Sequence, residues 1–256
     1  HNWYYGILGT NESLYAWMDE GFTSYAEDRV TAFLENSTGF PYDGSYKGYY
    51  SLAKSGKEEP LTTHADHFNY NSAYGTAAYS KGDVFLEQLG YIVGASVRDK
   101  ILLEYYKQWR FKHPNMADFI RVAEKVSDMK LDWYKEYWVN SIKTIDYSID
   151  SLWEEGGKTK IRLGRIGLMP MPIDAQLTFK DGTKELHYIP MNLMYAEKPV
   201  EESTIPRKVY DAWKWTYNTY IIETNRKLTD FTIVEIDPSQ RLADIERKNN
   251  RLELKL

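Results

Sequence analysis

The chain has 256 residues, of which 43% are hydrophobic and 27% are charged, a composition typical of globular domains and unlike that of disordered segments. Its length allows one large domain or two ordinary ones, each with its own hydrophobic core. The formal net charge of −5 argues against nucleic acid as a main partner, because neutralising phosphates requires a concentrated basic surface.

The chain contains no cysteine, which excludes disulfide bonds, thiolate metal sites and cysteine nucleophiles and leaves the cellular compartment open. No apolar run approaches the roughly 18 residues of a transmembrane helix, and no leader with a charged and then an apolar region is present. Because the first residue is a histidine rather than methionine, we expect an excised segment or mature fragment that any export signal would precede.

The first part of the chain shows helical periodicity. Apolar residues at i, i+4 steps predict a helix over 14–34 with Ser13 as its N-cap. The same pattern predicts further helices over 79–93, 98–109, 116–126 and 131–142. We therefore expect a helical domain over residues 1–144.

From residue 145 the period of the apolar residues changes to two. Residues 173–179 alternate apolar and polar side chains, and Asp181-Gly182 is a signal for a two-residue hairpin loop. A loop closed there pairs Leu177 with Leu186. Segments 216–224 and 228–237 are predicted as further strands. Short strands divided by turns predict a β-sandwich over residues 145–256, so the fold class is α+β multidomain.

The spacing of His1 and Glu20 bears on metal chemistry. Zinc hydrolases use three protein ligands and leave a fourth position open for water. In a His-Glu-x-x-His helix, two histidines one turn apart bind zinc, and the glutamate activates the water. A carboxylate on the following helix is a suitable third ligand, and Glu20 lies within the predicted helix 14–34, with eighteen residues between it and His1. Taken singly, His1 is also consistent with a tag remnant and Glu20 with a solvated helix residue.

The spacing, the tryptophan at position 3 and the segment WMDEGFTSYAE resemble the aminopeptidase N family of gluzincin metallopeptidases. This resemblance implies that His1 is the second histidine ligand and Glu20 the third ligand of one zinc ion, with Asp19 where the family usually has asparagine. The helical domain would be the C-terminal half of a thermolysin-like catalytic domain. The first histidine, the catalytic glutamate and the segment that holds a substrate's amino terminus would precede residue 1. We therefore expect this 256-residue chain to be inactive and to bind zinc weakly or not at all.

A second segment, Tyr79-Ser80-Lys81-Gly82, is similar to the Tyr-x-Lys-Gly segment that supplies the family's catalytic tyrosine. The resemblance implies that the Tyr79 hydroxyl donates a hydrogen bond to the oxyanion formed from the peptide carbonyl. Tyr74 is a weaker candidate for lining the same cleft. Gly82 is expected to admit close helix packing, and Lys81 to be solvated.

The other histidines are interpreted as structural or exposed. The spacing of His64 and His67 is compatible with a metal site on a helix, but the polar stretch around them favours an exposed loop. His113 precedes a proline in a turn, and His187 is expected on the outer face of the hairpin. The segment VEIDPSQRLADIERKNN resembles the end of the β-sandwich that bacterial members of the family append.

The resemblance therefore implies a zinc-dependent metallopeptidase that hydrolyses peptide or protein substrates as an aminopeptidase. The compartment is not readable from the chain, and a periplasmic, envelope or exported location is compatible with bacterial relatives that carry a β-sandwich. Two other interpretations stay open. One is a non-catalytic scaffold or binding protein with the same fold. The other is a carbohydrate-binding surface module, because the chain is rich in tyrosine and tryptophan.

Overall fold

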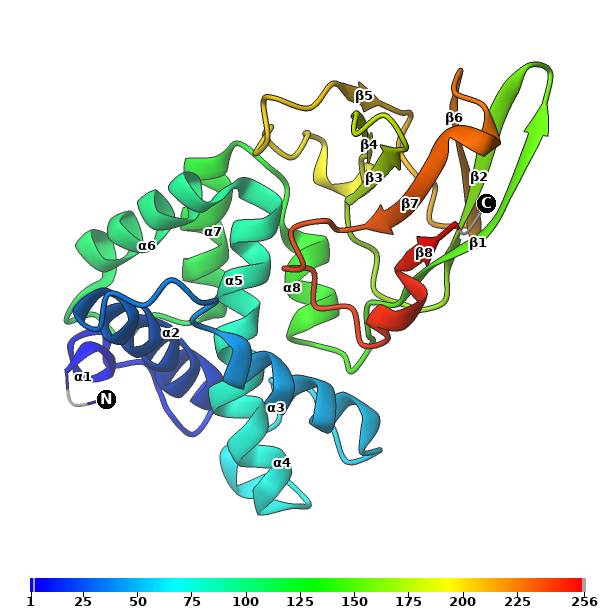
Figure 1. The fold of residues 1–256 in the computed structure, drawn as a ribbon. Helices are drawn as coiled ribbons and strands as arrows, with labels where there is room; N and C mark the ends of the chain where they lie inside the picture. The colour runs from blue at the N-terminus through cyan, green and yellow to red at the C-terminus, as the bar shows by residue number, and fades with distance from the viewer. Residues whose placement is uncertain (2, 255–256) are drawn as a thin grey trace. The chain divides into compact units, whose positions relative to one another are not determined.

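The computed structural model describes residues 1 and 3–254, which fall into two compact units, His1–Ile142 and Lys143–Leu256. The first unit is helical and the second contains two β-sheets (Figure 1). The predicted α+β multidomain class is thus confirmed. Among the described residues, no helix combines the length and the apolar character that crossing a membrane requires.

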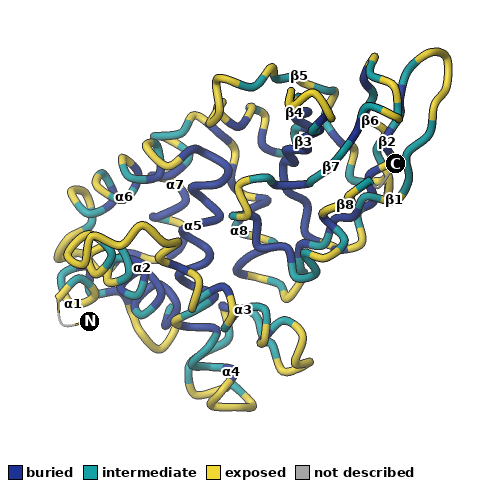
Figure 2. Tube along the Cα trace, viewed as in Figure 1, coloured by how far each residue is buried: buried dark blue, intermediate teal, exposed yellow. Residues whose placement is uncertain are grey.

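The helices of the first unit are α1 (Tyr4–Leu8), α2 (Ala16–Leu34), α3 (Asp43–Lys54), α4 (Asn71–Gly75), α5 (Gly82–Val93), α6 (Ala95–Trp109), α7 (Met116–Ser127) and α8 (Asp132–Trp138). A 3-10 turn, η1 (Ala65–His67), and a π-helical segment, η2 (Thr76–Lys81), lie between α3 and α5. Each residue of α5 is buried, as Figure 2 shows, and α2, α3 and α6 pack against it. A helix that is hydrophobic around most of its circumference belongs at the centre of a domain.

The core around α5 is aromatic. The ring of Phe22 on α2 lies 4.8 Å from that of Phe119 on α7, and Trp17 lies 5.0 Å from Phe85 on α5. These pairs meet edge to face, the arrangement that the ring quadrupoles favour. Trp17 and Phe22 therefore anchor the first turns of α2 and fix the direction in which the residues between them point.

Most of the predicted helices are found with small shifts in their ends. Helix α2 begins at Ala16 rather than at residue 14, and Ser13 does not cap it, because Asn11 forms a turn with the backbone N–H groups of Ser13 and Leu14. The helix predicted over 131–142 ends at Trp138, where the next carbonyl, that of Val139, accepts a hydrogen bond from the Thr62 N–H. Helix α3 was not predicted.

The strands of the second unit are β1 (Tyr147–Glu155), β2 (Lys158–Arg165), β3 (Ile173–Phe179), β4 (Lys184–Ile189), β5 (Arg207–Val209), β6 (Thr219–Thr224), β7 (Phe231–Ile236) and β8 (Arg251–Glu253). They form a three-stranded sheet in the order β1-β2-β6 and a five-stranded sheet in the order β5-β4-β3-β7-β8. Among the strands of the described residues, β5 alone pairs in parallel, with β4. Strand β1 also contacts β7 and β8 of the other sheet, so buried side chains of both sheets belong to one core.

The predicted register of the β3–β4 hairpin is wrong by one residue. Leu177 pairs with Glu185 rather than with Leu186. The loop takes three residues, 180–182, because the Phe179 N–H donates to the Thr183 carbonyl and Gly182 adopts a left-handed conformation with φ of +81°. A three-residue loop that ends in a left-handed glycine is the next most common hairpin connection after the two-residue loop.

This shift of register changes the side of the sheet on which His187 lies. His187 pairs with the buried Ala175 and is itself only 1% exposed, so its predicted place on the outer face is wrong. Residues directly opposite each other in an antiparallel pair share one face, and a one-residue slip exchanges the faces. Both faces of β3 are largely buried, and the Asp174 carboxylate on it is neutralised by Lys198 at 2.5 Å.

Candidate active site

Glu20 lies in the second turn of α2, between the two aromatic anchors described above. Its side chain is 23% exposed, whereas Asp19 beside it is buried. Burial, followed by the charges of Glu20 and Glu12, raises the pKa of Asp19 to about 7. The α2 helix thus presents the Glu20 carboxylate to one side of the unit on a well-packed backbone.

Gly21 brings a second segment against this part of α2. A Cβ atom built on Gly21 would lie 2.5 Å from the Gly82 Cα and 2.8 Å from the Ala78 carbonyl oxygen. Only glycine permits such a backbone approach. The predicted role of Gly82 in close helix packing is confirmed, and this contact places η2 directly beside Glu20.

Tyr79 is carried by the π-helical segment η2, which α2, α3 and α4 contact. Short π-helical turns are rare and occur often at functional sites. The expected solvation of Lys81, two residues on, is wrong. Its side chain is completely buried, and its Nζ lies 2.7 Å from the Glu58 carboxylate, which is 5% exposed. This buried ion pair ties the end of η2 to the segment before α4.

His1 also lies beside Glu20. Its Nε2 atom is 3.2 Å from the Glu20 Oε2 atom, and its Nδ1 atom is hydrogen-bonded to the Glu27 carboxylate. The His1 ring centroid is 5.5 Å from that of Tyr79. Three residues that are distant in sequence therefore meet at one place in the helical unit.

The electrostatic surroundings keep the two tyrosines protonated. A hydrogen bond with Glu20, with burial as a second cause, raises the pKa of Tyr79. Burial, followed by the charge of Glu20, also raises the pKa of Tyr74. Both phenols are therefore neutral hydrogen-bond donors at physiological pH, and the charge of the Glu20 carboxylate contributes to the pKa of each.

The donor set at this place suits zinc in kind. An imidazole nitrogen and a carboxylate oxygen converge, and the second imidazole nitrogen is held by a further carboxylate, as is usual for histidines that bind zinc. Across residues 1 and 3–254, no group of three or more His, Cys, Asp or Glu side chains is arranged to hold a metal ion. His1 and Glu20 would thus supply two protein ligands of a zinc site, one fewer than a catalytic site uses.

The remaining histidines lie apart from this group. The ring centroids of His64, which caps η1, and His67, which ends it, are 4.8 Å apart, and the His64 Nδ1 accepts a hydrogen bond from the Asp66 N–H. His113 contacts the Gly9 carbonyl oxygen at 2.7 Å. Sequence reasoning missed Glu27, although it lies seven residues after Glu20 and therefore on the same face of α2. No sequence signal indicated that Glu58 pairs with Lys81.

Comparison with known proteins first defines the fold. The structure is similar to the crystal structure of Legionella pneumophila aminopeptidase A in complex with aspartic acid, with a TM-score of 0.57 and 12% sequence identity. That likeness covers 92% of this chain and 24% of the other. The model of the peptidase family M1 domain matches residues 1–138. The chain belongs to peptidase family M1, as its resemblance to aminopeptidase N predicted.

Two curated relatives are fungal proteins named leucine aminopeptidase 2. The one from Neurospora crassa is 24% identical over 250 residues, which are 95% of this chain and 34% of the relative. The one from Chaetomium globosum is 24% identical over 193 residues, which are 73% of this chain and 29% of the relative. The chain thus spans about a third of the length of the curated relatives it matches.

Proposed function

We propose that the protein of which this chain is part is a zinc-dependent peptidase that removes residues from the amino termini of peptides or proteins. The observation that carries the proposal is the approach of His1 Nε2 to Glu20 Oε2, with Glu27 on the second imidazole nitrogen. Membership of family M1 and the aminopeptidase names of the relatives support the choice of reaction.

In this proposal His1 and Glu20 would hold a zinc ion, and Glu27 fixes the orientation of the His1 ring so that Nε2 faces Glu20. A bound zinc ion supplies a Lewis acid that polarises the scissile carbonyl. Tyr79 donates a hydrogen bond to the oxygen on which negative charge develops, for which a neutral phenol is required. Tyr74 is a second candidate for lining the same cleft, which is supported by the effect of the Glu20 charge on its pKa.

The roles of Glu20 and Tyr79 are separable by experiment. The assay uses the full-length natural protein that contains this chain. Its activity is measured by the hydrolysis of an aminoacyl chromogenic amide, and its bound zinc by elemental analysis. We expect Glu20→Gln to lose both zinc and activity. Tyr79→Phe should keep zinc and KM while kcat falls by about 10²–10³, the usual effect of removing one oxyanion donor. Tyr70→Phe, which alters an exposed tyrosine of the same unit, is the matched control. Full activity of Tyr79→Phe would disprove the assigned role.

We further propose that the 256-residue chain alone has no peptidase turnover and binds zinc weakly or not at all. Its sequence has no His-Glu-x-x-His, so it lacks both a third ligand of that kind and a general base. Turnover by the purified chain at a rate typical of its relatives would contradict this. A longer natural form that binds no zinc and hydrolyses no peptide would instead favour a scaffold, and glycan binding by residues 145–256 a carbohydrate module.

A further inference from the structure

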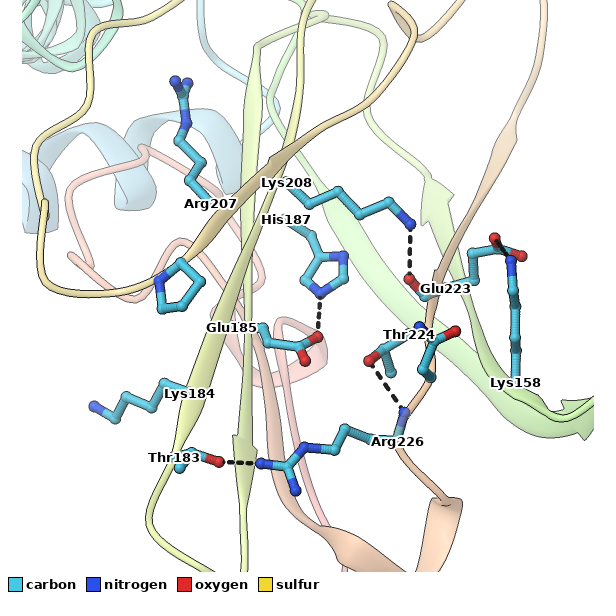
Figure 3. A pocket seen from close by; sticks show the side chains of 12 residues that line it. Lys158, Thr183, Lys184, Glu185, His187, Arg207, Lys208, Glu223, Thr224 and Arg226 are labelled. Atoms are coloured by element: carbon cyan, nitrogen blue, oxygen red, sulfur yellow. Dashed lines mark hydrogen bonds and ion pairs between the residues drawn. The ribbon is translucent and has the colours of Figure 1, made fainter.

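The second unit contains a cavity of about 640 Å³ that the proposed peptidase function does not use. Its walls come from both sheets, at the strands that end each one, β5 and β6, and from the neighbouring strands β2 and β4 (Figure 3). The lining residues are Lys158, Thr183, Lys184, Glu185, His187, Pro206, Arg207, Lys208, Glu223, Thr224, Asn225 and Arg226. Its volume falls within the range of small-molecule sites.

Hydrogen bonds between the two sheet edges fix the strands that line this cavity. The Tyr210 hydroxyl donates to the Glu223 carbonyl at 2.9 Å and accepts from the Glu223 N–H at 3.0 Å. The buried His187 lies between the Tyr210 hydroxyl, at 2.8 Å from Nδ1, and the Glu185 carboxylate, at 3.1 Å from Nε2. The edge strand β6 is thus attached to β4 through side chains, and the space beside this attachment is the cavity.

The lining is positively charged although the whole chain is negative. Five cationic side chains face two carboxylates, a net charge of +3 for the lining against −5 for the chain. One of the carboxylates, that of Glu223, is engaged by Lys158. A hollow lined mainly by one sign of charge concentrates ions of the opposite sign.

Three of the five lining cations, Lys184, Arg207 and Lys208, form no ion pair within the described part of the chain, and the last two are held by other contacts. The Lys208 Nζ atom donates to the Glu223 carbonyl at 3.1 Å and lies 4.7 Å from the Tyr210 ring centroid. Arg207 donates to the Lys198 carbonyl at 2.9 Å and stacks over Tyr188 at the rim, directed away from His187 in Figure 3. Lys208 therefore presents at the cavity an ammonium group that forms no ion pair in the described part of the chain. Its charge acts at longer range on the Glu223 carboxylate, whose pKa is lowered first by the hydrogen bond from Lys158 and also by Lys208.

The opposite side of the cavity supplies donors of another kind. The Arg226 guanidinium reaches across to Thr183 and also bonds Asp181 at 2.9 Å, so its position is fixed (Figure 3). Thr224 and Asn225 add neutral hydrogen-bonding groups at the end of β6. A planar guanidinium, an ammonium and neutral donors around one hollow form a set that suits phosphate or carboxylate oxygens.

We propose that this cavity binds a small polyanion, either a phosphate compound or a polycarboxylate, through Lys208 and Arg226. The proposal stands independently of the peptidase assignment, since every residue it uses lies in the second unit. Two probes distinguish these classes of ligand: inorganic phosphate stands for the phosphate compounds and citrate for the polycarboxylates. Sodium chloride at equal ionic strength is the reference for general salt effects.

The 256-residue chain is titrated with each probe by calorimetry and by amide NMR. We expect saturable binding of one probe, with chemical-shift changes at the amides of Thr224, Asn225 and Lys208. Lys208→Gln should weaken that binding about tenfold, which is equivalent to about 1.4 kcal/mol. Lys214→Gln removes the same charge from an exposed position of the same unit outside the cavity and should leave binding unchanged.

The outcomes that overturn the proposal are distinct. Absence of saturable binding by both probes would refute it, as would equal weakening by Lys208→Gln and Lys214→Gln, which would indicate a general charge effect. If Lys208→Gln disturbs the fold, Arg226→Lys tests the same site, because it keeps the charge and removes the planar fork. Unchanged affinity in a folded Arg226→Lys variant would then count against the assigned role of Arg226.

Discussion

Replacing Gly21 with alanine tests whether the backbone contact between α2 and η2 holds the candidate active site together. The added Cβ would lie 2.5 Å from the Gly82 Cα, whereas non-bonded carbon atoms prefer about 3.5–4.0 Å, so the two segments must separate by about 1 Å. Overpacking of this kind costs about 1–3 kcal/mol. Because the atoms that collide belong to backbone rather than to flexible side chains, we expect a cost at the upper end.

Alanine also favours a helix interior over glycine by about 0.5–1 kcal/mol, which offsets part of this cost. The net loss in the free energy of unfolding of Gly21→Ala should therefore be about 2 kcal/mol, or a Tm lower by about 4–8 °C. Urea and thermal unfolding are followed by the circular dichroism of the helices. The control is Gly44→Ala in α3, where the new Cβ meets nothing within 4 Å and stability should stay equal or rise slightly. If both variants were as stable as the wild type, the close contact would not constrain the fold.

Three further predictions concern buried charges, and each is checked by denaturant unfolding. Lys81→Met should cost about 3–5 kcal/mol because it leaves the Glu58 carboxylate buried without its partner, and Lys81→Met with Glu58→Gln should recover much of that loss; a double variant no more stable than the single one would contradict the pairing. Burial raises the pKa of Asp83 from 3.8 to about 8, so the native state keeps a proton that the unfolded chain releases. Wild-type stability should consequently fall as pH rises from about 4 to 8, and a fall equally steep in Asp83→Asn would show that another group is responsible. Asp244→Ala removes the acceptor for the N–H groups of Tyr147 and Glu246 and for the Asn250 amide, and at about 1 kcal/mol for each bond it should cost about 3 kcal/mol; a loss below 1 kcal/mol would mean that water replaces the carboxylate.

The parts of the fold and site that could be predicted from sequence depend on local patterns. Helical spacing located α2, α5, α6 and α7 because each buries a stripe or a whole surface that recurs every three or four residues. The spacing of His1 and Glu20 predicted that the two residues share one site, and the structure places their side chains 3.2 Å apart. Family membership followed from the same segment.

The parts that could not be predicted depend on contacts between distant residues. Lys81 was expected in solvent because nothing near it in the sequence reveals Glu58, with which it pairs. The predicted register of the hairpin was wrong because Asp181-Gly182 is compatible with loops of two or three residues. The left-handed conformation of Gly182 and the hydrogen bond between Phe179 and Thr183 select the three-residue loop. The cavity could not be predicted because its walls come from strands that are neighbours in space and not in sequence.

The attachment of Tyr210 to Glu223 also affects how the protein behaves at high concentration. The outer edge of β6 faces away from β2 and would otherwise offer a free N–H and a free carbonyl at Glu223 as a template for a strand from another molecule. One hydroxyl occupies both groups at once. A foreign extended peptide therefore finds neither a donor nor an acceptor at this point, and a single phenol protects the molecule from edge-to-edge self-association there.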